Sequence, residues 1–252
     1  RVAASAMAPS PPPAVFAAVD TTDLAAAEAL ATKLAAQPGL GIKLGLEFFC
    51  AHGGAGVSRV AKAAPEAAIF LDLKFHDIPN TVAGAVRAVV PLQVSMINVH
   101  AAGGAAMMRA AAAAATEAAQ AHGVPRPTLI AVTVLTSLDD SDLEAVGQKG
   151  PAESQVVRLA KLVQECGLDG VVCSSKEIGA IRAACGAEFV LVVPGIRPAG
   201  GELGDQKRVM TPADAMRAGA TSLVVGRPIT QAADPVEAAR AIVSEATGAV
   251  AA

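Results

Sequence analysis

The sequence predicts an α/β protein, a single-domain (β/α)8 TIM barrel. The chain of 252 residues with 53% hydrophobic content can bury one full-sized core. Short β-branched runs alternate with Ala-rich helical segments, at the spacing of roughly 20 to 40 residues that a barrel of strand–helix units requires. We therefore expect the barrel to occupy residues 14–252. Residues 1–13, which end in three prolines, are expected to form a disordered lead-in.

Eight candidate strands follow in order along the chain. They are residues 15–19, 41–44, 69–73, 96–99, 129–134, 170–173, 189–193 and 222–225. Two helix starts are specified locally, because Thr211 and Asp234 are each followed by a proline and then by an acidic residue at the third position. A doubly wound open sheet remains the alternative, since periodicity alone does not show that the last strand pairs with the first.

Composition argues against several classes of partner. The net charge is -3, the 20 basic residues are scattered and aromatic residues make up 2%, so we expect no nucleic-acid partner. The apolar run 101–115 is rich in small residues and contains Arg109, which predicts a helix of a soluble protein and no membrane span. The four cysteines lack C-x-x-C spacing and are expected to be reduced, buried thiols of a cytoplasmic protein.

The third candidate strand carries charges inside an apolar pattern. Residues 70–81 read Phe-Leu-Asp-Leu-Lys-Phe-His-Asp-Ile-Pro-Asn-Thr. Because side chains alternate along a strand, Asp72 and Lys74 share one face, and the other face is shared by Leu71, Leu73 and Phe75. We expect Asp77, in the following loop, to converge on the same spot, so this segment predicts a reactive site.

Polar residues also follow the other candidate strands. In a (β/α)8 barrel the active site lies at the carboxyl ends of the strands, so these residues should open onto one mouth. They are Asp20, Lys43, His100, Thr136, Arg197, Gly226 and Arg227. We expect His100, and His76 after the third strand, to have structural roles.

The loops after the seventh and eighth strands predict a phosphate site. Barrels often bind phosphate there, with backbone N–H groups that glycines such as Gly226 allow to approach closely. The guanidinium of Arg227 can grip two phosphate oxygens, and Gln206 can add an amide contact. Facing this site, the row of opposite charges suits decarboxylation with protonation of the carbanion by a lysine. There is no dinucleotide fingerprint, P-loop or Cys/His cluster, so we expect no cofactor and no metal.

The motif Asp-x-Lys-x-x-Asp-Ile-Pro-Asn-Thr at residues 72–81 resembles the signature of the orotidine 5'-phosphate decarboxylase family. Further counterparts of the family's motifs appear in family order from Asp20 to Arg227. They include Leu-Thr-Ser at residues 135–137, Pro-Gly-Ile-Arg-Pro at residues 194–198 and Gly-Arg-Pro at residues 226–228.

The resemblance implies a cofactor-free homodimer that converts orotidine 5'-phosphate to UMP and CO₂, the last step of de novo pyrimidine synthesis. It implies that Lys74 protonates C6 and that Asp72 lies against the substrate carboxylate. Lys43 would orient Asp72 and contact the ribose with Asp20. The remaining roles are implied as follows: Asp77 and Thr81 reach the neighbouring subunit's site, Ile78 binds substrate, Thr136 lies near the pyrimidine, and Arg197, Gln206, Gly226 and Arg227 hold the phosphate.

Two other functions stay open on the sequence. A Mg²⁺-dependent sugar-phosphate decarboxylase or aldolase shares the barrel and a related Asp-x-Lys-x-x-Asp pattern, with carboxylates that bind the metal. The Ile-Pro-Asn-Thr continuation at residues 78–81 argues against it. A barrel that binds a phosphorylated ligand without catalysis is the third possibility, and the complete set of charges disfavours it.

Overall fold

A computed structural model describes residues 9–198 and 210–248. The strands are β1 (Val15–Ala18), β2 (Leu40–Leu44), β3 (Ile69–Phe75), β4 (Met96–His100), β5 (Thr128–Val132), β6 (Gly170–Val172), β7 (Val190–Pro194) and β8 (Ser222–Val225). The helices are α1 (Leu24–Ala35), α2 (Leu46–Ala63), α3 (Pro79–Val89), α4 (Gly104–His122), α5 (Asp140–Ala145), α6 (Ala152–Glu165), α7 (Ile178–Cys185), α8 (Pro212–Ala218), α9 (Arg227–Thr230) and α10 (Pro235–Gly248). Two 3₁₀ turns, Val90–Leu92 and Ala101–Gly103, follow α3 and β4.

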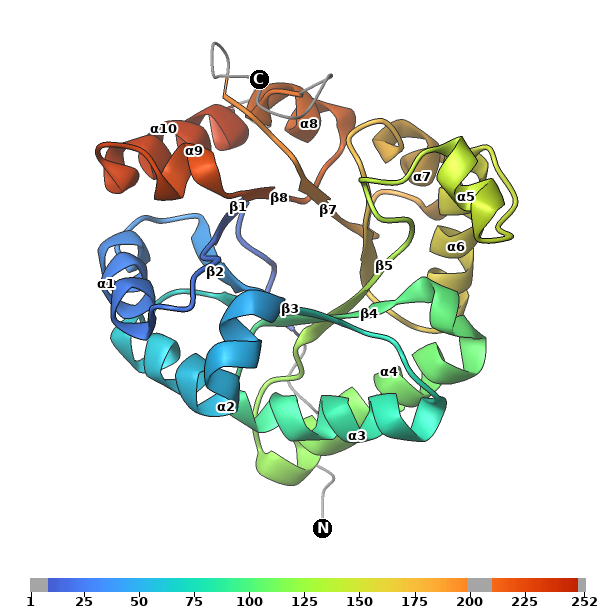
Figure 1. Ribbon diagram of the computed structural model, residues 1–252, viewed down its shortest axis with the longest axis horizontal. Helices are drawn as coiled ribbons and strands as arrows, with labels where there is room; N and C mark the ends of the chain where they lie inside the picture. Colours follow the sequence, from blue (N-terminus) through green and yellow to red (C-terminus); the bar gives the residue numbers. More distant parts are fainter. Residues whose placement is uncertain (1–8, 199–209, 249–252) are drawn as a thin grey trace.

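The eight strands form a closed parallel barrel in which neighbours in sequence are neighbours in space. β1 pairs with β2 on one side and with β8 on the other, so that Val15 lies opposite both Leu40 and Leu223. Figure 1 looks down the barrel, with the strands at the centre and the helices around them. The pairing of β1 with β8 confirms the predicted TIM barrel and excludes the open sheet.

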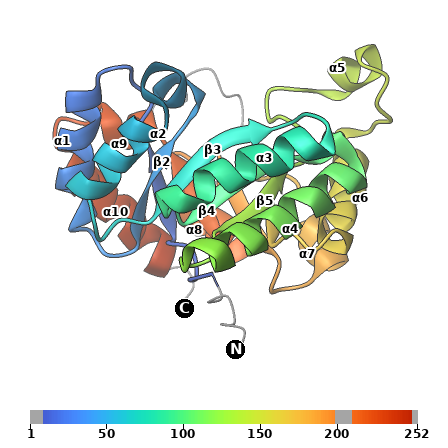
Figure 2. The same cartoon turned by 90° about the horizontal axis from the view of Figure 1, so that it is seen from below.

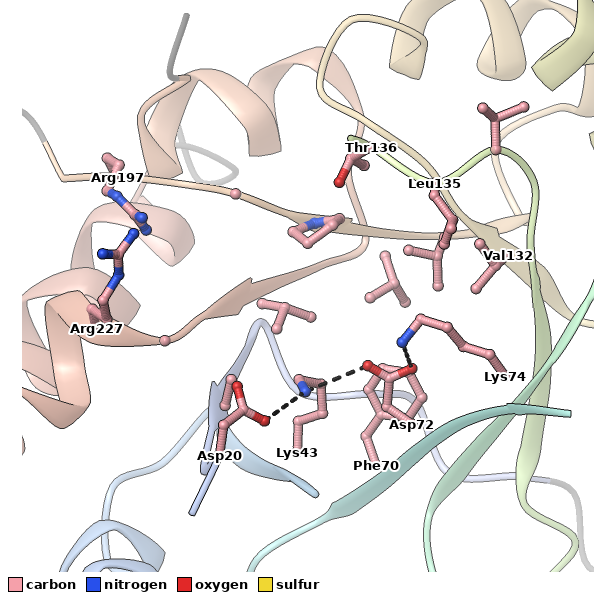
Figure 3. Close-up of a pocket in the computed structure, with 18 residues that line it drawn as sticks. Asp20, Lys43, Phe70, Asp72, Lys74, Val132, Leu135, Thr136, Arg197 and Arg227 are labelled. Atoms are coloured by element: carbon pink, nitrogen blue, oxygen red, sulfur yellow. Dashed lines mark hydrogen bonds and ion pairs between the residues drawn. The ribbon is translucent and has the colours of Figure 1, made fainter. Parts of the chain in front are cut away.

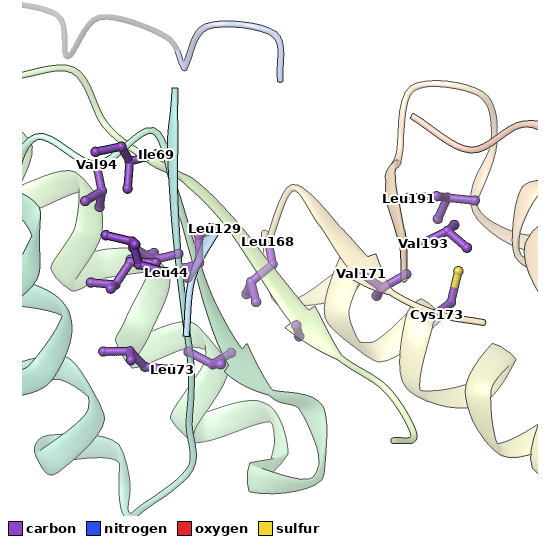
Figure 4. Packing of buried hydrophobic residues seen from close by; sticks show 14 of the residues in the cluster. Leu44, Ile69, Leu73, Val94, Leu129, Leu168, Val171, Cys173, Leu191 and Val193 are labelled. Carbon is purple, nitrogen blue, oxygen red and sulfur yellow. The ribbon is translucent and has the colours of Figure 1, made fainter. Parts of the chain in front are cut away.

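Apolar side chains form one layer outside the barrel and a smaller one inside it. The outer layer packs between strands and helices and includes Leu44, Leu129 and Val193 (Figure 4). Inside the barrel, the rings of Phe16 and Phe70 lie 5.5 Å apart. Because helices cover the outside and side chains fill the inside, both faces of each strand are apolar, which explains the nearly continuous hydrophobic runs of the sequence.

The helix ends follow local sequence signals. Thr211 caps α8 by accepting a hydrogen bond from the backbone N–H of Asp214, and Asp234 accepts from two backbone N–H groups at the start of α10. Both predicted starts are therefore confirmed. α3 and α4 lie side by side (Figure 2), and no helix in the described ranges has the length and apolar content needed to cross a membrane.

Most strand boundaries differ from the prediction by one or two residues. β3 continues two residues beyond residue 73, to Phe75, and β5 ends at Val132 instead of residue 134. Of the predicted lead-in, residues 1–8 lie outside the described part, whereas the Pro13 carbonyl accepts a hydrogen bond from Ser222 Oγ at 2.6 Å. Pro13 is therefore held against the start of β8.

Candidate active site

The carboxyl ends of the strands surround a cavity of about 390 Å³. Its floor is the apolar interior of the barrel, including Phe70, Val192 and Val224. Eight of the predicted site residues line it: Asp20, Lys43, Asp72, Lys74, Thr136, Arg197, Gly226 and Arg227. The barrel thus brings together residues that are up to 207 positions apart in the sequence, as the strand-end argument predicts.

Four of these residues form a row of alternating charge along one side of the cavity (Figure 3). Lys43 Nζ lies 3.4 Å from Asp20 Oδ1 and 3.4 Å from Asp72 Oδ2. Lys74 Nζ lies 2.6 Å from Asp72 Oδ1. Asp72 therefore has an ammonium group against each carboxylate oxygen, and Lys43 is shared between two carboxylates.

The position of Asp72 keeps it ionised. Burial alone raises the pKa of this carboxyl, but the charges of Lys43 and Lys74, with hydrogen bonds from Lys74 and Asn98, outweigh burial and hold the pKa below its usual value. At neutral pH the cavity therefore presents a fixed anion between two amino groups. Such a preorganised set of charges can stabilise a change of charge in a bound molecule without first reorienting water.

The backbone of β3 is irregular where it presents Lys74. Lys74 has a φ of 50°, which is unusual for a residue with a side chain, and the β3–β4 register shifts between Leu71 and Phe75. The predicted alternation survives the shift, because Asp72 and Lys74 line the cavity while Leu71 and Leu73 are buried in the outer layer.

Asn98 contacts this irregular segment and is missing from the residues that the sequence predicts for the site. Its side chain is fully buried and forms hydrogen bonds with Asp72 and with the backbone of Lys74. The available signal is its inward position in β4, where Met96 faces the barrel interior and Ile97 and Val99 face the helices. A lone amide at an inward strand position indicates a buried polar partner nearby.

Two arginines lie apart from the row of charges. The guanidinium groups of Arg197 and Arg227 face each other in Figure 3, after β7 and at the start of α9. Gly195 and Gly226 line the cavity beside them. Two cations beside accessible backbone suit an anion with several oxygens, such as a phosphate. Gln206, the other predicted phosphate contact, lies outside the described residues.

Asp77, Ile78 and Thr81 do not line this cavity, so within one chain Asp77 converges with Lys74, in a neighbouring hollow, but not with Asp72. The chain leaves the barrel after Phe75, and Asp77 and Thr81 line a separate hollow of about 320 Å³ next to Lys74. Ile78 is 66% exposed at the start of α3. All three residues lie on the outer rim.

His100 also lies outside the cavity lining, contrary to the expected common mouth. Its ring stacks on that of His76, with centroids 5.1 Å apart and planes 13° apart, and its Nδ1 accepts a hydrogen bond from the backbone N–H of Ala102 at 3.2 Å. Burial, followed by the nearby His76 and Lys74, lowers the pKa of His100. The pair packs beside the site, in agreement with the structural roles expected for both histidines.

The chain is similar to known proteins along most of its length. Residues 13–242 match the family model described as the orotidine 5'-phosphate decarboxylase / HUMPS family. A protein of Moorella thermoacetica named orotidine 5'-phosphate decarboxylase is 59% identical over 92% of this chain and 91% of its own length. One of the same name from Rhodospirillum rubrum is 54% identical over 93% of this chain and 94% of its own. The crystal structure of orotidine 5'-phosphate decarboxylase from Lactobacillus acidophilus is 36% identical and superposes with a TM-score of 0.81, covering 93% of this chain and 99% of that one.

Proposed function

Because this chain belongs to the orotidine 5'-phosphate decarboxylase / HUMPS family, we infer that it is a carboxy-lyase that converts orotidine 5'-phosphate to UMP and CO₂. This reaction is the last step of de novo pyrimidine synthesis. The relatives that are 59% and 54% identical bear the name of this decarboxylase. The observation that carries the inference is the ion pair of Asp72 and Lys74, 2.6 Å apart at one side of the cavity.

We propose that Lys74 and Asp72 carry the chemical step. Breaking the bond between C6 and the carboxylate releases CO₂ and leaves an electron pair on C6. Lys74 Nζ supplies the proton that forms the new C6–H bond, and the amine then regains a proton from water. Asp72, an anion beside the position of the substrate carboxylate, repels that carboxylate until it leaves as neutral CO₂.

The row of charges supports this proposal better than a single lysine does. Enzymes reach rate accelerations of about 10¹⁷, or roughly 23 kcal/mol of barrier lowering. One pair of unit charges at 4 Å is worth about 4 kcal/mol at an effective dielectric of 20. The rest of the barrier lowering must come from a preorganised network, Asp20, Lys43, Asp72 and Lys74, and from binding energy at the remote part of the substrate.

The arginine end of the cavity supplies that remote binding energy in our proposal. Arg197, Gly226 and Arg227 hold the phosphate, with Gln206, which lies between β7 and α8 in the sequence. Asp20 and Lys43 contact the ribose, and Thr136 lies near the pyrimidine. The support is the arrangement of the cavity, with its row of charges separate from its two facing cations. Orotidine 5'-phosphate fits this arrangement in our proposal, because its phosphate can lie at the arginines while its carboxylate lies at the end that holds Asp72 and Lys74.

We propose that the enzyme acts as a homodimer in which Asp77, Ile78 and Thr81 complete the site of the neighbouring subunit. These residues lie on the outer rim beside Lys74 and do not line the cavity of their own chain. A role in substrate binding therefore requires a second copy, with its mouth placed against this rim. The carboxylate of Asp77 already accepts a hydrogen bond from the backbone N–H of Ile78 at 2.6 Å, which fixes its direction.

A cytoplasmic location is also part of the proposal. The four cysteines are free thiols, as expected for a reducing compartment. Three of them, Cys166, Cys173 and Cys185, are buried as predicted, whereas Cys50 is exposed on α2. Burial raises the pKa of the Cys173 thiol above its usual range, so this group stays protonated and inert.

The test is an absorbance assay of orotidine 5'-phosphate with purified protein in excess EDTA, alongside Lys74→Ala. We expect rapid conversion to UMP by the wild type and a rate at least about 10³-fold lower in the variant, because the proton donor is lost. Lys33→Ala, which removes an exposed lysine of α1, should keep the wild-type rate. No conversion in EDTA, together with Mg²⁺-dependent activity on a sugar phosphate, would instead identify the chain as a Mg²⁺-dependent sugar-phosphate decarboxylase or aldolase. An active Lys74→Ala would leave the reaction assigned and remove Lys74 from it.

A further inference from the structure

Asn98 occupies the inner face of β4, directly across from the segment of β3 that carries Asp72 and Lys74. Its side chain is 0% exposed, in a strand whose other residues are apolar apart from the terminal His100. A buried carboxamide is costly unless both its N–H and its C=O groups find partners. Its partners in this barrel are the two residues proposed to carry the chemistry.

The carboxamide bridges these residues with two short hydrogen bonds. Asn98 Nδ2 donates to Asp72 Oδ1 at 2.7 Å, and Asn98 Oδ1 accepts from the backbone N–H of Lys74 at 2.8 Å. Asp72 Oδ1 is the same oxygen that lies 2.6 Å from Lys74 Nζ. One rigid amide therefore fixes the orientation of the carboxylate and the backbone from which the lysine extends.

The second hydrogen bond lies where the ordinary strand pairing fails. Leu71 pairs with Ile97 and Phe75 pairs with Val99, so the register of β3 against β4 shifts between these pairs. Within the shifted segment Lys74 adopts its left-handed conformation, which costs free energy for any residue other than glycine. The side chain of Asn98 takes the place of a strand partner for the Lys74 N–H and so stabilises this conformation.

We propose that Asn98 is a positioning residue for decarboxylation, which holds the Asp72 carboxylate and the left-handed backbone of Lys74 in the arrangement that aims both groups into the cavity. The proposal rests on the roles proposed above for Asp72 and Lys74. Asn98 lines no part of the cavity and so acts only through these two neighbours.

Two substitutions test this role. Asn98→Ala removes both hydrogen bonds. Asn98→Asp hardly changes the volume and keeps an acceptor for the Lys74 N–H, but at neutral pH it cannot donate to Asp72. We expect the single-turnover decarboxylation rate to fall roughly 10- to 100-fold in Asn98→Ala and at least as far in Asn98→Asp, because each loses a hydrogen bond to a charged group. The affinity for UMP, measured by calorimetry, should change less than about threefold, because the arginine end of the cavity is untouched.

The pH dependence of the rate separates positioning from a general loss of structure. The charged groups around Asp72 are Lys43 from β2 and Lys74 from β3, with Asp20 on the far side of Lys43. The hydrogen bond from Asn98 helps to lower the pKa of Asp72. Without it, the fall of the rate at acidic pH, the acid limb of the pH–rate profile, should begin at a higher pH in Asn98→Ala. Ser222→Ala is the matched control, since Ser222 is also fully buried and hydrogen-bonded in a strand, but at the opposite end of the barrel, where its Oγ donates to Pro13. Ser222→Ala should be less stable than the wild type, but its decarboxylation rate and the acid limb of its pH–rate profile should be those of the wild type.

The proposal is overturned if folded Asn98→Ala keeps a rate within about twofold of wild type with an unmoved acid limb while Lys74→Ala is inactive. If Asn98→Ala does not fold, Asn98→Asp decides alone, and a wild-type rate at neutral pH in that variant refutes the need for the donor. An active Lys74→Ala is a different result, because it refutes the proposed role of Lys74 on which the positioning role depends.

Discussion

Lys43 holds the row of charges together, because it is the residue shared by two carboxylates. Its side chain is only 10% exposed, and its Nζ lies 3.4 Å from both Asp20 and Asp72. A buried ammonium group of this kind is tolerated only while it is paired. Removing it leaves Asp72 with the charge of Lys74 alone, so a substitution of Lys43 tests directly whether the two lysines keep Asp72 ionised.

We expect Lys43→Met, which keeps most of the side-chain volume, to shift the titration of Asp72 to higher pH. Burial raises the pKa of Asp72, and in the wild type Lys43 is foremost among the groups that reverse this effect. A carboxyl whose folded-state pKa is depressed stabilises the protein above its unfolded-state pKa and loses that contribution as pH falls through the folded-state value. The variant should therefore begin to unfold at a higher pH, and should be about 1 to 3 kcal/mol less stable at neutral pH.

Circular dichroism during an acid titration is the suitable measurement, because the chain has no Trp or Tyr to report by fluorescence. The single-turnover rate should show the same upward movement of its acid limb. Lys62→Met, which removes an exposed lysine at the end of α2, is the control and should leave both profiles in place. Coincident acid titrations of Lys43→Met and wild type would show that Lys43 does not depress the pKa of Asp72.

The sequence predicts the charged side chains of the cavity well, because their positions depend on two simple rules. Strand alternation places Asp72 and Lys74 on one face, and the barrel rule gathers Asp20 and Arg227 at the same mouth. Neither rule identifies Asn98 as a site residue, because a single amide inside an apolar strand carries no charge and belongs to no motif. Its importance depends on the shifted β3–β4 register, which is a property of how two strands pair and of neither strand alone.

Gly170, the first residue of β6, leaves no room for a side chain between its strand and β7. A Cβ atom on this residue would lie 2.1 Å from the carbonyl oxygen of Val190 in β7. The obstructing atom belongs to the backbone, so no side-chain rotation can relieve the contact. β6 and β7 are paired at Gly170 and Val190, and the two strands would have to separate.

We expect Gly170→Ala to lower the free energy of unfolding by about 3 kcal/mol, because the added methyl group overpacks a backbone contact. Gly179→Ala is the matched control, and we expect it to change the free energy of unfolding in the opposite direction. Gly179 is exposed in α7, and apart from its chain neighbours and the backbone of its own helix no atom lies within 4 Å of the position that an alanine methyl group would take, so alanine should stabilise the helix by up to about 1 kcal/mol. The midpoints of urea unfolding followed by circular dichroism measure both. Equal midpoints for Gly170→Ala and wild type would contradict the close approach of β6 and β7.

The elements are predictable to the extent that their signals are local. Thr211 and Asp234 start α8 and α10 as their capping patterns predict, and the eight apolar runs give the eight strands. The extension of β3 to Phe75 is not predictable in the same way. Its last residue, Phe75, follows Lys74, which has a φ of 50° and whose backbone N–H donates to the side chain of Asn98 in the adjacent strand. A non-local hydrogen bond therefore accompanies the end of this strand, and no local sequence signal predicts it.

The molecule as a whole separates its polar residues into a mouth and a rim. The mouth holds the row of charges and the two arginines, whereas Asp77, Ile78 and Thr81 lie outside it, around the start of α3. Strand geometry places the first group, since the carboxyl ends of all strands meet there. The second group follows the turn out of β3, and in the homodimer that we propose it completes the site of the neighbouring copy.

Heterodimers of two inactive variants decide whether Asp77 acts across the interface. Lys74→Ala and Asp77→Ala homodimers should both be inactive. In a heterodimer of the two, purified through different tags, one site combines the intact Lys74 of one chain with the intact Asp77 of the other, so we expect about half of the wild-type activity.

A heterodimer of wild type with the double variant Lys74→Ala/Asp77→Ala has no site with both residues intact and should be inactive. If Asp77 serves its own chain, the two heterodimers exchange results, because only the wild-type chain of the second pair then carries a complete site. A monomer in sedimentation analysis with full activity would reject the shared site altogether.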